Sequence, residues 1–251
     1  MSDYLKSLEW RYATKKFDTN KKMTDEQLNI LLDSIQLTAS SYGLQPYEVI
    51  VVENKDIRSK LSDAAWKQPQ IMDANYVLVF AANTNVDETY LEKYMQNTAD
   101  TRGISLEDLS GFSDMIKNTV LTFPQDVRVE WAKRQAYIAL GNLLSSAAVH
   151  EIDACPMEGF DPAQFNEILD LPSKNLDATV IATIGFFATV LITNLAVGWS
   201  FTPKKSSEFK WPSNFCFPSP SKSNTLMVVM STVNSPPTSS PPSISKNPSF
   251  S

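Results

Sequence analysis

The sequence predicts a protein of mixed α/β or α+β class, with helices on the faces of a central mixed sheet. Segments with helical periodicity alternate along the chain with short runs of β-branched residues. The longest periodic run, residues 126–149, is apolar over much of its circumference. The chain is 43% hydrophobic and 20% charged, which is typical of a globular protein with a sizeable core. Because helices separate the strands, we expect some strand pairs to be parallel.

The helices are predicted from their periodicity and their end signals. A capping box of Thr24 and Gln27, followed by leucines at helical spacing, predicts a helix over residues 25–37. Asp161 and Pro162 supply the cap and first residue of a short helix that reaches about residue 169. The other predicted helices cover residues 3–10, 55–65, 86–98 and 126–149. Small residues in the last of these let another backbone approach, so we expect a central helix and an oligomer contact.

Three runs predict buried strands because they are short and β-branched. They cover residues 47–53, 75–82 and 178–186, and a further short strand precedes the sequence ACPMEGFD at residues 154–161.

Composition excludes several classes of function. A formal net charge of -6 and a pI near 4.9 argue against a nucleic-acid partner. The charged N-terminus lacks the apolar region of a signal peptide, so we expect a cytoplasmic protein. Cys155 and Cys216 form no CxxC pair, and a single histidine, His150, cannot build a histidine-rich metal site. We expect no metal, and we expect His150 at a helix C-terminus.

Composition also changes near residue 186. The last 65 residues hold nine prolines and fifteen serines but one acidic residue, so residues 1–186 are predicted to be the folded domain and residues 187–251 a mostly disordered tail. Residues 178–203 carry no charge, but the predicted last strand accounts for the first nine, so we expect no membrane partner. A shifted reading frame or a retained intron would also change the composition this abruptly.

Three polar segments are candidates for a binding site. RYATKKFD, residues 11–18, carries Arg11 and Lys15 four residues apart, which on a continuing helical turn would grip one anion. TASSYGLQPY, residues 38–47, places hydroxyl groups and amides in a turn after a helix. ACPMEGFD combines a proline that restricts the chain with a glycine that permits close approach.

Each segment also has a purely structural interpretation. The first is a solvated basic face, the second a common helix stop, and the third a strand-to-helix connection in which Glu158 points to water. Cys155 is expected to be a small core residue rather than a nucleophile. The sequence has no GxGxxG and no GxxxxGK[ST] motif, so any difficult chemistry is expected to belong to a bound cofactor.

The order of these segments resembles the FMN-dependent nitroreductase family. The resemblance covers residues 3–186 and rests on four motifs: R-x-x-x-K near residue 11, a helix ending in SSxxxQPY, LVF after Met72-Asp73-Ala74, and PxEGFD after a long Ala/Gly-rich helix. The chain is most similar to bacterial oxygen-insensitive NAD(P)H nitroreductases and dihydropteridine reductases. The resemblance implies a nitroreductase-like α+β fold.

The resemblance implies FMN as the anion at the N-terminal segment. Arg11 matches the arginine that contacts the FMN phosphate, and Tyr12 and Ala13 give neighbouring contacts. Lys15 matches the lysine directed at the N1/O2 edge of the flavin, where a cation stabilises the reduced anion.

Further FMN contacts are implied elsewhere in the chain. Ser40 and Ser41 match the family's paired serines, and Lys67 matches an asparagine beside the flavin ring. Gln70 is implied in the nicotinamide or substrate pocket. The loop that packs on the ring is matched by Pro156, Met157, Glu158 and Gly159. Its last two amides are implied to reach flavin N5 and O4.

The resemblance further implies a ping-pong NAD(P)H oxidoreductase. NADH or NADPH passes hydride to flavin N5 and leaves, and a nitroaromatic or quinone then takes the electrons. The implied assembly is a homodimer with FMN at the subunit interface. The chemistry is carried by FMN, so no side chain is assigned a catalytic role.

The chain departs from this family after residue 186. In the family, a polar segment follows and supplies a Lys/Arg pair to the FMN phosphate, whereas this chain continues FATVLITNLAVGWSFTPKK. The alternative function is therefore an impaired or non-catalytic flavin-fold protein, tethered through its tail, that binds FMN weakly.

Overall fold

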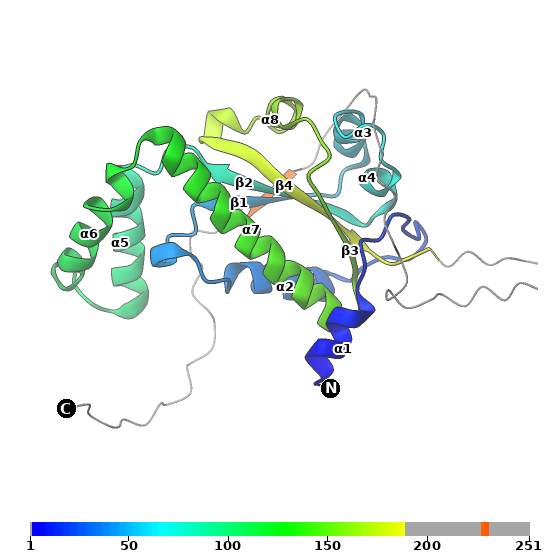
Figure 1. The fold of residues 1–251 in the computed structure, drawn as a ribbon, viewed down its shortest axis with the longest axis horizontal. Helices are drawn as coiled ribbons and strands as arrows, with labels where there is room; N and C mark the ends of the chain where they lie inside the picture. Colours follow the sequence, from blue (N-terminus) through cyan, green and yellow to red (C-terminus); the bar gives the residue numbers. More distant parts are fainter. Residues whose placement is uncertain (1, 189–226, 231–251) are drawn as a thin grey trace, which may run out of the picture.

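The computed structural model describes residues 2–188 and 227–230. In this part of the chain a five-stranded sheet lies between helices (Figure 1). The strand order is β3-β4-β2-β1-β5. The strands are β1 (Tyr47–Val52), β2 (Tyr76–Asn83), β3 (Asp153–Met157), β4 (Leu176–Gly185) and β5 (Met227–Met230). The α+β class is confirmed.

The prediction of a mixed sheet is wrong for these strands, because all neighbouring strands are antiparallel. Two short helices, α3 (Lys55–Asp63) and α4 (Pro69–Asp73), connect β1 to β2. They carry the chain out and back to the end of the sheet from which it left, so Val52 pairs with Val77. A single helix crossing would have brought the chain to the other end, where a parallel pair begins.

Two helices cover one face of the sheet. They are α2 (Asp25–Gln36) and the long α7 (Gln125–Val149), whose buried residues share a core with Val49, Leu78 and Val180. The predicted capping box of α2 is confirmed: Gln27 N donates to Thr24 Oγ1 at 3.2 Å and Thr24 N donates to Gln27 Oε1 at 3.0 Å.

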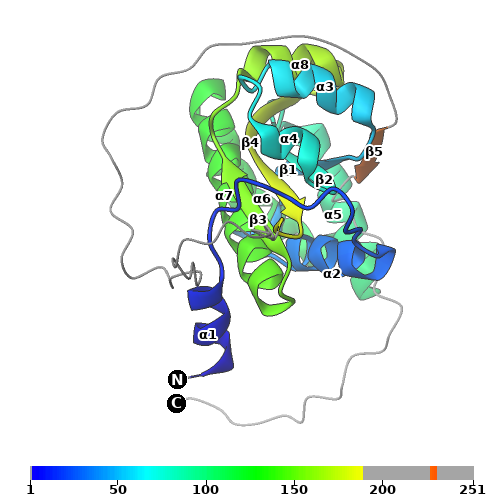
Figure 2. The ribbon, with the colours of Figure 1, turned by 90° about the vertical axis from the view of Figure 1, so that its right-hand side faces the viewer.

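The other face is covered by α3, α4 and α8 (Pro162–Leu169), and Figure 2 shows α3 beside α8. Phe165 of α8 and Leu61 of α3 are both fully buried there. The predicted start of α8 is confirmed, because Asp161 Oδ1 accepts from the N–H of Ala163 at 2.9 Å and Pro162 occupies the first turn.

Three further helices lie at the margins. The helices α5 (Glu88–Arg102) and α6 (Ser110–Lys117) share a separate core with the first turns of α7, through Trp131 and Ala132. The N-terminal α1 (Asp3–Trp10) lies against α7, where Tyr4 Oη donates to Ser145 Oγ at 3.4 Å. Short 3₁₀ turns occur at Ser41–Gly43, Glu107–Leu109, Val120–Thr122 and Pro172–Lys174.

Most predicted elements are confirmed within a few residues, but α4, α6 and β5 were not predicted. His150 is the C-cap of α7, as expected. The predicted tail lies outside the described residues except at 187–188 and at β5, which is a strand where disorder was expected. Among the helices of the described part of the chain, none has the length and apolarity needed to cross a membrane.

Candidate functional site

The N-terminal basic segment lies along the outer edge of β3. The helix α1 ends at Trp10, and Arg11 already has extended backbone with φ -71° and ψ 143°. Ala13 forms an isolated parallel bridge with Ala154, whose carbonyl accepts from Thr14 N at 3.3 Å. The prediction that Arg11 and Lys15 share a helical turn is therefore wrong. Strand pairing, not helix geometry, holds this segment.

A buried carboxylate fixes the segment from below. Thr14, which is fully buried, donates through its hydroxyl to Asp153 Oδ1 at 2.9 Å. The other oxygen of Asp153 accepts from the N–H of Phe187 at 2.7 Å. Asp153 therefore joins the basic segment, β3 and the chain leaving β4, and neither the composition nor any local motif had singled it out.

The chain leaving β4 continues this contact. Phe17 and Phe187 form an antiparallel bridge, and Ala188 N donates to Lys16 O at 3.1 Å. The rings of Tyr12 and Phe187 meet edge to face, with centroids 5.9 Å apart. Burial, and then the negative charge of Asp153, raise the pKa of Tyr12, whereas its hydrogen bond to Thr14 lowers it. The departure from the family pattern thus begins directly beside the basic segment.

The three cations of this segment have no carboxylate partner within residues 2–188 and 227–230. Lys15 instead donates through Nζ to Cys155 Sγ at 3.4 Å. Cys155 is fully buried, as the structural interpretation of this residue predicted. The cations at the edge of β3 therefore have no ion-pair partner in the described part of the protein, which favours an anionic ligand.

The sequence ACPMEGFD was expected to form a single connection between a strand and a helix, but the structure divides it between a strand and a loop. Pro156 and Met157 belong to β3, and the loop begins at Glu158. The carbonyl of Glu158 accepts from Phe160 N at 3.0 Å, and Asp161 N donates to Ala64 O at 2.8 Å. The loop is thereby attached to the turn that follows α3.

A tyrosine on α7 contacts the same loop. Tyr137 Oη donates to Glu158 Oε1 at 2.7 Å, so Glu158 has a protein partner rather than water alone. Partial burial, followed by this hydrogen bond and the charge of Glu158, raises the pKa of Tyr137 to about 12. The sequence offered no signal for this pair, because the two residues meet only in the folded chain.

The turn after α3 brings two further candidates to this loop. Lys67 has left-handed backbone with φ 58°, and its exposed ammonium lies 4.0 Å from Asp63 Oδ1. Gln70 is only 2% exposed, and its Nε2 donates to Gln68 Oε1 at 3.4 Å. Gln68, which the sequence analysis missed, reaches the loop directly and donates to Gly159 O at 2.7 Å.

The paired serines do not join this cluster within one chain. Ser41 N donates to Gln135 Oε1 at 2.9 Å, and Ser40 Oγ accepts from Gln45 N at 2.9 Å. Gln135 and Tyr137 are two residues apart on α7, so they project about 200° apart around the helix axis. The serines therefore lie on the opposite side of α7 from Glu158.

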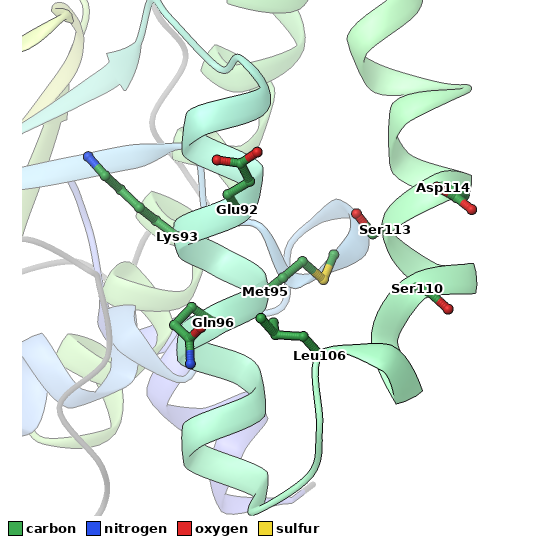
Figure 3. A pocket seen from close by; sticks show the side chains of 8 residues that line it. All are labelled: Glu92, Lys93, Met95, Gln96, Leu106, Ser110, Ser113 and Asp114. Atoms are coloured by element: carbon green, nitrogen blue, oxygen red, sulfur yellow. The ribbon is translucent and has the colours of Figure 1, made fainter.

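A separate hollow of about 580 Å³ lies between α5 and α6 (Figure 3). In the figure, Met95 and Leu106 lie between the two helices, with charged and polar side chains around them. Its lining is Glu92, Lys93, Met95, Gln96, Leu106, Ser110, Ser113 and Asp114. None of the candidate site residues belongs to it.

The described residues also contain no cluster of His, Cys, Asp and Glu able to hold a metal ion.

Comparison with known proteins gives consistent matches. A family model described as the nitroreductase family matches residues 8–186. A "putative NAD(P)H nitroreductase" of Staphylococcus epidermidis is 33% identical over 187 residues, which are 71% of this chain and 85% of that protein. A protein of the same description, YfkO of Bacillus subtilis, is 31% identical over 193 residues, covering 72% of this chain and 87% of that protein.

Solved structures share the fold. A nitroreductase-like protein from Streptococcus mutans superposes with a TM-score of 0.67 at 21% identity, covering 84% of this chain and 98% of that one. A "putative nitroreductase" of Exiguobacterium sibiricum, solved in complex with FMN, has a TM-score of 0.65 at 16% identity and covers 78% of this chain and 94% of that one.

Proposed function

Because the chain belongs to the nitroreductase family, we propose that it is an FMN-dependent NAD(P)H oxidoreductase that reduces nitroaromatic compounds or quinones. The observation that carries the proposal is the outer edge of β3. There Arg11 and Lys15 lack carboxylate partners among the described residues, and the Glu158 loop lies at the end of the same strand. FMN is anionic at its phosphate and gains negative charge on reduction, so cations in this place favour it.

The backbone of the loop also fits FMN. Within the described residues, the N–H groups of Glu158 and Gly159 donate no hydrogen bond, whereas the carbonyls of both accept one. Unpaired N–H groups at the end of the strand that the basic segment borders suit acceptor atoms on a flavin edge. We assign the holding of FMN to Arg11, Lys15 and this loop. Further contacts are assigned to Tyr12, Ala13, Lys67, Pro156 and Met157.

When bound, FMN supplies the redox chemistry, accepting hydride from NAD(P)H and passing the electrons to the acceptor in a ping-pong sequence. The protein's own part is to hold charge and orientation. Asp153 and Thr14 fix the backbone on which Lys15 stands, and Cys155 contacts its ammonium. Lys15 is exposed, so protons reach the edge of β3 from solvent.

We extend the proposal to a homodimer that completes the FMN site. The outward face of α7 exposes Tyr137, Ile138 and Val149 at 41–50%, and α1 beside it exposes Leu5 and Trp10. Apolar side chains of this size on neighbouring helices favour a protein interface. Ser40 and Ser41 lie on the far side of α7 from Glu158 in one chain, so a second chain would have to contribute them. Light scattering on the full chain tests this, and a monomer in solution with FMN bound would refute it.

Turnover tests the proposed activity. The full chain is saturated with FMN, and the loss of NADH or NADPH absorbance is followed with a nitroaromatic or a quinone as acceptor. The proposal predicts acceptor-dependent oxidation with parallel double-reciprocal lines. FMN-loaded protein that does not oxidise either nucleotide would favour the impaired flavin protein instead.

A further inference from the structure

The turn between α3 and α4 has an unusual backbone that presents one side chain to the candidate site. Trp66 and Lys67 are consecutive non-glycine residues with left-handed φ values of 54° and 58°. This conformation is costly for such residues and persists only where contacts hold it. Here Lys67 N donates to Ser62 O at 2.7 Å and Gln68 N donates to Ala65 O at 3.2 Å. The result is that Gln68 stands at the N-cap of α4 and faces the loop after β3.

The carboxamide of Gln68 joins three partners. Its Nε2 donates to Gly159 O at 2.7 Å and to Ala65 O at 3.2 Å, and its Oε1 accepts from Gln70 Nε2 at 3.4 Å. Because the carbonyls of Gly159 and Ala65 only accept hydrogen bonds, they set which end of the Gln68 amide faces Gly159, and the buried Gln70 contacts the other end.

Gly159 is matched to this contact by its size. A Cβ added at Gly159 would lie 3.2 Å from Gln68 Nε2 and 3.2 Å from Trp66 Cζ3, which is tighter than ordinary van der Waals contact. An alanine at this position would require the Gln68 and Trp66 side chains to move by a few tenths of an ångström.

The contact also orients the loop. The carbonyl of Glu158 accepts a hydrogen bond from Phe160 N, and the carbonyl of Gly159 accepts one from Gln68 Nε2. The N–H of Asp161 donates to Ala64 O. The N–H groups of Glu158 and Gly159 remain without an acceptor in the part of the chain that the structure describes. Fixing the carbonyls in this way leaves these N–H groups available to a ligand.

We propose that Gln68 is a positioning residue for FMN binding, which holds the Glu158–Gly159 loop with its N–H groups open to the flavin. This inference rests on the proposed function. Gln68 acts through the loop and need not touch the cofactor. Loss of its hydrogen bond would let the loop rotate. Part of the FMN binding free energy would then be used to order the loop again.

The test compares Gln68→Met, which keeps length but loses the hydrogen bonds, with Gln68→Glu, which places an acceptor against Gly159 O. The matched control is Gln96→Met, because within residues 2–188 and 227–230 the Gln96 side chain on α5 hydrogen-bonds only to the nearby Asp100. FMN dissociation constants are measured by flavin fluorescence on the full chain. We expect roughly tenfold weaker binding for Gln68→Met, about one hydrogen bond's worth, and a larger loss for Gln68→Glu, with the control unchanged.

A second readout does not need FMN. Deuterium uptake of the peptide covering residues 157–161 in FMN-free protein is expected to rise in both Gln68 variants and not in the control. Should a Gln68 variant fail to fold, Gly159→Ala disturbs the same contact from the other side. FMN affinity within twofold of wild type together with unchanged uptake would overturn the inference. Failure of the wild-type chain to bind FMN, with uptake still raised in the variants, would instead overturn the proposed function and leave the loop contact standing.

Discussion

Asp153 offers the sharpest test of how the basic segment is held. Its carboxylate accepts from Thr14 Oγ1 at 2.9 Å and from Phe187 N at 2.7 Å. Replacing Asp153 by Ala removes both acceptors and leaves two donors unpaired, one of them on the fully buried Thr14. Each lost hydrogen bond to a charged group costs about 1.5–3 kcal/mol, so we expect a loss of roughly 3–5 kcal/mol in unfolding free energy after partial relaxation.

Asp153→Asn is the matched comparison. Its amide oxygen still accepts from Phe187 N, and its NH₂ group donates to the Thr14 hydroxyl, which can reverse its role. Only the charge assistance is lost, so we expect a cost of about 1 kcal/mol. Urea denaturation followed by circular dichroism measures both variants.

A double-mutant cycle completes the test. Thr14→Val combined with Asp153→Ala should cost less than the sum of the single changes, by about 1–2 kcal/mol, because the two residues share one hydrogen bond. Equal destabilisation by the Ala and Asn variants, or full additivity in the cycle, would refute the proposed role of this carboxylate.

Three further predictions follow from single contacts. Arg11→Ala and Lys15→Ala should each weaken FMN binding about tenfold or more, through loss of a charge-assisted contact, whereas Lys93→Ala on α5 should not; equal affinities in a fluorescence titration would contradict this. Arg58 is fully buried and donates to three backbone carbonyls between residues 71 and 75. Arg58→Met should therefore lower the unfolding free energy by about 3 kcal/mol or more, measured by urea denaturation. A loss under about 1 kcal/mol would contradict this. The pKa of Tyr137 is raised to about 12, so its phenolate should appear near pH 12 rather than about 10 in an ultraviolet titration corrected with Tyr137→Phe. The unfolding free energy that this tyrosine contributes should fall as pH rises from about 10 to 12, because the unfolded state loses the proton first.

Local signals in the sequence were enough for most helices and strands. The capping box at Thr24 and the Asp161-Pro162 pair are written within a few residues, and the structure places α2 and α8 where those residues predict. The relative direction of neighbouring strands could not be predicted from such local signals. It depends on α3 and α4 together returning the chain to one end of the sheet, and α4 is only five residues long.

The candidate site shows the same division. The charge of RYATKKFD was visible in the sequence, but its geometry comes from a bridge between Ala13 and Ala154, far apart in the chain. Gln68 was missed because its role arises from a contact with Gly159, 91 residues away. Asp153 and Tyr137 were missed for the same reason. Chemical type can be read from the sequence, whereas partners and orientation depend on long-range packing.

We propose that the edge of β3 and the Glu158 loop together bind FMN. The most direct measurement is the visible absorption spectrum of the purified full chain, incubated with FMN and then desalted. We expect near-stoichiometric flavin absorbance, which Arg11→Ala combined with Lys15→Ala abolishes. A wild-type chain that remains colourless after desalting, or a double variant that stays as yellow as wild type, would contradict it.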